Sequence, residues 1–341
     1  MKKNYFMLAA ATVMFAACAE TDLVNEINEA EAQYAIGFET FTNKTTRAEW
    51  TAEGLKEEGG GFQVWGYKTS GSYSHTVFNG VDVTWSDSKW GYTDTQYWDE
   101  KATYNFYAVA PAEGSYSITD GNIKITNVAS ANKNDSKDYL IDRAGNTNVD
   151  GSKKQLVEFD FNHVMAKLSF VLKKATGIDD DITVTKLTMS GWNGSAGTFT
   201  QSLKATPTDN SHGEWSYATA NDVTGSFDVV ASNLPIDAVG VEVTNEYIVV
   251  PQTVTYTAAT VVDGTETIPE SGLTFTISYI IGDVTTGEVF TEQVGVMPSN
   301  QVWGTDTHTT YTITVGPAAI EFSAKTVAGF QDNTGSTTTI K

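Results

Sequence analysis

Apolar and polar residues alternate over short stretches along most of the chain. Each stretch is rich in Val, Ile, Thr, Tyr, Phe and Trp, the residues that suit a pleated, half-buried strand. Gly, Asn, Asp and Ser separate the stretches. The clearest are residues 61–68 (GFQVWGYK), 103–111 (TYNFYAVAP), 157–172 (VEFDFNHVMAKLSFVL), 246–254 (EYIVVPQTV), 272–281 (GLTFTISYII) and 309–315 (TTYTITV). The pattern predicts an all-β protein of the sandwich type.

Helical patterns are scarce, and two domains are expected. Residues 51–59 and parts of 173–180 are the best helical stretches, and both are short. The sequence has no visible repeat of fixed short period, which argues against a solenoid or propeller. Roughly 290 residues follow Arg47, which is more than one sandwich core holds. Residues 143–154 (RAGNTNVDGSKK) contain almost nothing apolar, so we place the link there. This predicts β-sandwich domains over residues 48–150 and 151–341.

The first residues are typical of an export signal. Lys2 and Lys3 precede the uncharged residues 5–17 (YFMLAAATVMFAA), a run too short to span a bilayer but suited to a signal peptide. We therefore assign residues 1–17 to a signal peptide.

The only cysteine of the chain, Cys18, follows directly after this signal. The sequence FAAC resembles a lipobox, in which the exported chain begins at an acylated cysteine, although Phe15 stands where bulky aliphatic residues are commoner. A thiolate is a good nucleophile for such a thioether. We expect Cys18 to carry lipid, as palmitate, that ties the precursor to the cell outer membrane. The alternative is a buried, inert cysteine. With one cysteine, the chain has no internal disulfide.

The charge balance disfavours two classes of partner. The chain has 21 Lys and Arg against 42 Asp and Glu, for a net charge of −21. Such a charge makes nucleic acid and anionic lipid poor partners. After the signal, no apolar run in the sequence is long enough to cross a membrane.

Candidate catalytic and metal-binding patterns are weak. The four histidines are isolated and lack zinc-ligand spacing. NGSAG (193–197) lacks the glycine of a nucleophile elbow and predicts a hairpin turn. Asp179–Asp181 has no calcium-loop pattern and reads as a solvated turn. His163 alternates with phenylalanines, so we expect it to face inward and bond to the backbone. We expect no enzyme activity, no metal and no cofactor.

An aromatic cluster in a loop-rich stretch allows two interpretations. Its members are Trp85, Trp90, Tyr92, Tyr97 and Trp98. We favour a satellite core beneath loops. The alternative is a glycan platform, which would make the protein a monomeric surface lipoprotein that binds glycans or host ligands.

Several motifs, in their order along the chain, resemble the fimbrillin family. They are the lipobox, TTRA (45–48), YNFYAVAP (104–111), VEFDFNHVMAKLSF (157–170), EYIVVPQT (246–253) and YTITV (311–315) followed by IEFSAKTV (320–327). The family comprises FimA- and Mfa-type subunits of type V pili in Bacteroidales. The resemblance implies two transthyretin-like, Greek-key β-sandwich domains in tandem in a fimbrial structural subunit that supports adhesion at the cell surface. Shaft, anchor and tip subunits share this architecture.

The resemblance also implies a way of assembly. A trypsin-like protease cuts after an arginine and removes the first strand, and a strand from another fimbrial subunit fills the groove. Here the leader is residues 18–47, in which Tyr34, Ile36 and Phe38 alternate, and the expected cut lies between Arg47 and Ala48. Ile36 and Phe38 would fill the groove before cleavage. Arg143–Ala144 is a rival cut that would split the domains, and Arg47 can also be an ordinary linker arginine.

A second occurrence of the leader pattern lies near the C-terminus. Residues 35–38 and 319–322 share the pattern A-I-x-F. We therefore expect Ile320, Phe322 and Ala324 of a neighbouring subunit to enter the same pockets, with Glu321, Ser323 and Lys325 towards solvent. Alternatively, this strand completes its own domain.

Overall fold

The computed structural model describes most of the chain beyond residue 33. The described residues are 34–42, 54–56, 60–114, 116–119, 121–132, 135, 137–142, 146–202, 213–217, 223–262, 266–317 and 320–329. The expected signal peptide, Cys18, Arg47 and Ala48 lie outside the described residues, as does the rival site at 143–144.

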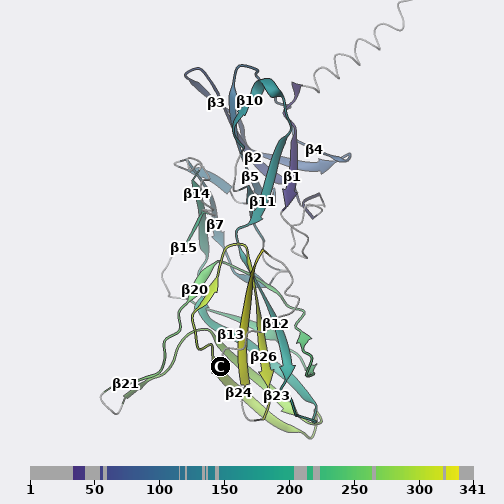
Figure 1. Ribbon diagram of the computed structural model, residues 1–341, viewed down its shortest axis with the longest axis vertical. Helices are drawn as coiled ribbons and strands as arrows, with labels where there is room; N and C mark the ends of the chain where they lie inside the picture. The colour runs from purple at the N-terminus through teal and green to yellow at the C-terminus, as the bar shows by residue number, and fades with distance from the viewer. Residues whose placement is uncertain are drawn as a thin grey trace, which may run out of the picture.

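The described chain is built from β-strands and two short 3-10 turns, which confirms the all-β prediction. The turns are η1 (Gly54–Lys56) and η2 (Gly151–Lys153). Figure 1 shows an upper group of strands from the first half of the chain and a lower group from the second half.

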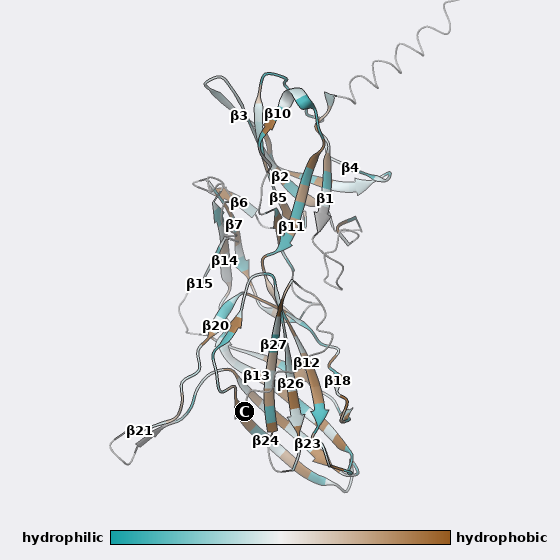
Figure 2. Ribbon diagram, in the orientation of Figure 1, coloured by the Kyte–Doolittle hydropathy of each residue, from teal (hydrophilic) through white to brown (hydrophobic). Residues whose placement is uncertain are grey.

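The first sheet holds eight strands. Its order is β1 (Phe38–Thr42), β11 (Val157–His163), β9 (Leu140–Asp142), β5 (Thr103–Ala110), β2 (Phe62–Ser70), β3 (Tyr73–Ser86) and β4 (Lys89–Gly91), with β10 (Asn146–Asp150) also paired to β5. Figure 2 shows apolar and polar residues in alternation along β11. Its apolar residues Val157, Phe159 and Phe161 are buried. Period-two alternation thus places one face of the strand in the core.

The first sheet curls so that its two ends meet. Phe38 of β1 and Phe78 of β3 lie five positions apart in the strand order, yet their ring centroids are 5.4 Å apart. Strand twist accumulates across a sheet and allows such a roll. Half of the buried residues inside the roll are aromatic, and Phe62, Phe106 and Phe159 among them are fully buried.

Strands from both halves of the chain form a middle sheet. Its order is β15 (Glu214–Tyr217), β14 (Gly197–Ser202), β7 (Asn122–Val128) and β6 (Tyr116–Thr119). Phe199 of β14 pairs with Ile125 of β7, and both are fully buried. They belong to an apolar cluster that also holds Trp65 of β2 and Val250 from the second half of the chain. The two halves therefore share a core.

The second half of the chain forms a sandwich of two sheets. One sheet has the order β27 (Ile320–Ala328), β26 (Thr307–Val315), β12 (Ala166–Lys174), β19 (Tyr247–Val249) and β8 (Ala131–Asn132), with β18 (Val241–Glu242) beside β12. The other has the order β16 (Thr224–Val230), β13 (Ile182–Asn193), β23 (Thr274–Ile281) and β24 (Glu288–Val296), with β17 (Leu234–Ile236) beside β13. Two small pairs are β20 (Gln252–Val254) with β25 (Gln301–Trp303) and β21 (Thr260–Val262) with β22 (Glu266–Ile268).

The long apolar run at 157–172 becomes two strands in different sheets. β11 ends at His163 in the first sheet, and β12 begins at Ala166 in the sandwich. Val164 and Met165 between them are fully buried in the shared core. The division expected between residues 150 and 151 therefore does not coincide with a change of sheet, because β10 and β11 still belong to the first sheet.

Two local predictions need correction. Residues 173–180, given as a helical stretch, comprise the end of β12 and an irregular loop. NGSAG (193–197) is a turn in which Asn193 Oδ1 accepts from the Ser195 backbone N–H at 2.9 Å. It is not a hairpin turn, since β13 and β14 lie in different sheets.

The shared core predicts that the two halves unfold together. We expect a single thermal transition in calorimetry, because the middle sheet couples both halves. Phe199→Ala should cost about 3–5 kcal/mol and separate the transition into two. Val289→Ala, at a 63% exposed position, is the control and should change little. Two separated transitions in the unsubstituted protein would contradict a shared core.

Candidate functional site

The leader segment forms one edge of the first sheet. β1 runs parallel to β11, with Phe38 opposite Val157, Thr40 opposite Phe159 and Thr42 opposite Phe161. In Figure 1, β1 lies beside β11 in the upper part of the molecule. Residues 38–42 of the leader thus form a strand of this sheet. The expected cleavage site at Arg47 follows this strand in the sequence.

The residues just before β1 bond to the loop that follows β4, the last strand at the opposite end of the sheet. The Ile36 N–H donates to the Gln96 carbonyl at 2.8 Å, and the Trp98 N–H donates to the Tyr34 carbonyl at 2.8 Å. The Tyr92 hydroxyl donates to the Ile36 carbonyl at 2.7 Å. Burial raises the pKa of Tyr92, so this hydroxyl keeps its proton at neutral pH. The leader therefore bridges the two ends of the roll, because β1 pairs with β11 and the residues before it bond to the loop after β4.

Phe38 fills an aromatic pocket in the core of the roll. It is 4% exposed. The ring centroids of its aromatic neighbours lie 5.4–6.2 Å away, with stacked or edge geometries that favour aromatic pairs. These neighbours are Phe62, Phe78, Tyr92, Phe106 and Phe159. Ile36 is also buried, at 1% exposed. The leader thus contributes two of the buried side chains of this core.

The side chain of Lys154 contacts the leader at Tyr34. The Lys154 ammonium lies 3.7 Å from the centroid of the Tyr34 ring and 2.6 Å from Glu100 Oε1. The hydrogen bond to Glu100 raises the pKa of Lys154, so the side chain stays charged at neutral pH. Such an exposed cation–π contact contributes modestly to holding the leader.

The aromatic cluster after β3 is part of the core. Trp90 and Trp98 are 8% and 6% exposed and pack into the same cluster as Phe38. Trp85 and Tyr92 are partly buried against that cluster, whereas Tyr97 is 49% exposed. Two of the indoles that a flat glycan platform would need are therefore inside the protein, in the main core of the first sheet rather than in a separate satellite core beneath loops.

His163 faces inward but bonds to a carboxylate. Its Nδ1 lies 2.6 Å from Oδ2 of Asp138, which is fully buried. This partner is a side chain, whereas a backbone partner was expected. The pair fastens the end of β11 to the segment before β9, beside the hydrogen bond from the Val164 N–H to the Tyr139 carbonyl. The His163–Asp138 pair therefore has a structural role where the two halves of the chain meet.

The strand expected to act as donor lies at the edge of the sandwich. β27 pairs antiparallel with β26 over its full length. Ile320, Phe322 and Ala324 are partly buried against the sandwich core, and the Phe322 ring stacks on Phe275 at 5.2 Å. Glu321 is exposed, while Ser323 and Lys325 are half-buried. In the single chain this strand therefore completes its own domain.

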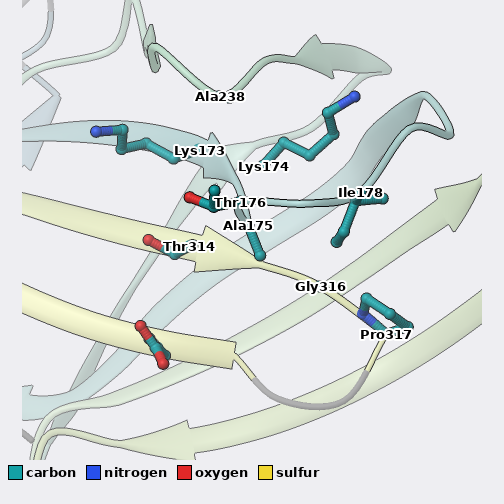
Figure 3. Close-up of a pocket in the computed structure, with 10 residues that line it drawn as sticks. Lys173, Lys174, Ala175, Thr176, Ile178, Ala238, Thr314, Gly316 and Pro317 are labelled. Atoms are coloured by element: carbon teal, nitrogen blue, oxygen red, sulfur yellow. The ribbon is translucent and has the colours of Figure 1, made fainter.

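An open cavity of about 590 Å³ lies at the far end of the sandwich. Figure 3 shows Lys173, Lys174 and Thr176 among its lining residues, with the two ammonium groups pointing in opposite directions. Lys174 Nζ donates to the Asp180 carbonyl at 3.1 Å. The charged groups therefore do not converge on one ligand.

The described residues contain neither a metal-binding cluster nor a membrane-spanning helix. None of their His, Cys, Asp and Glu side chains gather in groups of three or more that could hold a metal ion. Over the same part of the chain, we find no helix with the length and apolar character needed to cross a membrane.

The packing of Phe38 predicts a large loss of stability when its ring is removed. Phe38→Ala should lower the free energy of unfolding by about 3–5 kcal/mol, because the aromatic pocket cannot collapse fully. Urea denaturation measures the change. Tyr73→Ala is the control, since Tyr73 is 72% exposed near the tip of the β2–β3 hairpin, and should stay within about 0.5 kcal/mol. A similarly small effect of Phe38→Ala would mean that β1 contributes little to this core.

Comparisons with known proteins place the chain in a family. The chain matches the fimbrillin-like family model over residues 46–332. No curated protein matches its sequence. A fimbrial protein from Bacteroides vulgatus has a similar structure, with a TM-score of 0.59 and 20% identity, covering 86% of this chain and 99% of the other. A cell adhesion protein from Bacteroides ovatus gives a TM-score of 0.50 and 14% identity, covering 88% and 99%. With 287 of its 341 residues inside the family match, the chain belongs to the fimbrillin-like family.

Proposed function

We propose that this protein is a structural subunit of a cell-surface fimbria that supports adhesion. In this proposal it is exported as a lipoprotein acylated at Cys18, anchored in the outer membrane as a precursor, cut after Arg47 by a trypsin-like protease, and polymerised by strand exchange with other fimbrial subunits. Family membership supports the fimbrial role. The position of the leader strand supports the way of assembly.

The observation that carries the proposal is that β1 is both an edge strand and a core strand. It pairs with β11 alone among the named strands, and its Phe38 lies in the aromatic pocket. Loss of the leader would uncover the edge of β11 and leave the places of Ile36 and Phe38 empty. Unpaired backbone groups beside an apolar slot are satisfied together by an added strand.

Strand exchange of this kind gives filaments rather than closed rings. A donor strand on one subunit and an acceptor groove on the next are different surfaces, so each contact is head to tail. In this chain the groove lies in the first sheet, and β27 lies at the edge of the sandwich in the second half. One subunit can therefore use its two surfaces with two different neighbours.

Blocking the cut should block assembly. We expect purified Arg47→Ala precursor to remain monomeric after trypsin-like protease treatment, because the leader stays covalently attached. The wild-type protein should yield a chain beginning at Ala48 and higher oligomers. N-terminal sequencing and size-exclusion chromatography make both measurements. Oligomers of the Arg47→Ala protein would contradict the need for leader release at this bond.

The identity of the donor strand is tested by locking β27 in place. Thr312 of β26 lies opposite Ser323 of β27, at a spacing within the range of a disulfide. With Cys18 replaced by serine, the Thr312→Cys/Ser323→Cys protein should polymerise only after reduction if β27 must leave its own sheet.

The matched control is the same protein with reductant present throughout, which should polymerise like the wild type. Polymers formed by the oxidised protein would show that β27 stays in its sheet and is not the donor. Cross-link formation is checked by the mobility of the non-reduced chain.

A further inference from the structure

Two positions of the leader, one just before β1 and one within it, fit the acceptor groove poorly. Thr40 faces the core, 4% exposed, and its hydroxyl has no hydrogen-bond partner among the described residues. A buried hydroxyl without a partner lowers stability, because it loses its hydrogen bonds to water and gains none. Replacing that hydroxyl by an apolar group of the same shape should therefore strengthen the binding of the strand.

The second poor position is Gly37. Glycine loses more backbone freedom than other residues when it enters a strand, and it offers no side chain to pack. A Cβ at this position would meet only the end of the Leu156 side chain, at 2.9 Å. Leu156 is 50% exposed and can move aside. The groove therefore tolerates a side chain where the leader has none.

The strong position of the leader is Phe38, between the two weak ones. Its five aromatic neighbours form a pocket that only a ring fills, and Ile36 occupies the next buried position on the same face. The groove thus imposes an aliphatic residue, an aromatic residue two positions later, and a small residue two positions after that.

Resting on the strand exchange proposed above, we infer that β1 is a weakened occupant of its groove. It is displaced by an incoming strand that has the pattern aliphatic–x–aromatic–x–small apolar. That strand has a side chain at the position of Gly37 and no hydroxyl at the position of Thr40. The exchange then runs from β1 to the incoming strand, because the incoming strand fits the groove better than β1 does. Residues 320–324 (IEFSA) meet this description, with Glu321 at the position of Gly37 and Ala324 at that of Thr40.

The test follows the release of the leader from the full processed protein. The protein begins at Cys18, its only thiol, which carries a fluorophore, and a site for a sequence-specific protease follows Arg47. After the cut, fluorescence anisotropy reports release of the leader in the presence of excess peptide of residues 318–326 (AAIEFSAKT). The same peptide carrying Phe322→Ala should be ineffective, because it lacks the ring.

The decisive variants are at position 40. Thr40→Val keeps the branched shape and removes the hydroxyl, so release should slow by at least about fivefold. Thr40→Ser is the matched control that keeps the hydroxyl and loses the methyl group, and its leader should leave at least as fast as the wild-type leader. Thermal unfolding of the uncut proteins confirms that both variants fold.

The possible failures are distinguishable. Equal release rates for Thr40→Val and the wild type would overturn the inference while strand replacement still stood. Equal action of the two peptides would overturn the requirement for a ring. A leader retained in every protein at every peptide concentration would refute strand replacement, and the proposed way of assembly with it.

Discussion

The closure of the rolled first sheet is the constraint on which the rest of the structure depends. In the curled sheet β1 pairs with β11, and residues 34–36 just before it bond to residues 92–98 in the loop after β4, so the leader bridges the two ends of the sheet. The same strand carries Phe38 into the middle of the aromatic core, so backbone pairing and core packing depend on one short segment.

This arrangement couples folding to the proposed assembly. With its own leader in place, the first sheet covers the places of Ile36 and Phe38 and exposes no apolar slot there. The leader is held by a core aromatic ring and is weakened by a buried hydroxyl and a glycine. A separate apolar cluster, which holds Trp65 of the first sheet together with Phe199 and Ile125 of the middle sheet, joins the first sheet to the rest of the chain.

Much of the fold follows from local patterns in the chain. Residues 61–68, 103–111 and 309–315 each became a strand; β26 alternates buried and half-buried residues from Thr309 to Val315, whereas β5 is buried on both faces from Phe106 to Ala110. For residues 157–172 the local pattern does not predict the structure. Residues 164–166 (VMA) are apolar without alternation, and Val164 and Met165 are buried in the shared core, but nothing in the local pattern distinguishes this stretch from the middle of one long strand. The charged stretch before it suggested a link, yet β10 within that stretch pairs with β5.

The sequence by itself determined that the protein is all-β, that its leader contains a strand, and that Ile36 and Phe38 share one face, because period-two alternation is a property of neighbouring residues. Only the tertiary structure decided that this strand runs parallel to β11 and that its phenylalanine meets five rings from distant strands. It also decided that His163 finds Asp138 and that Phe322 stacks on Phe275. Strand order and partner choice depend on contacts between residues far apart in the chain, which no local pattern records.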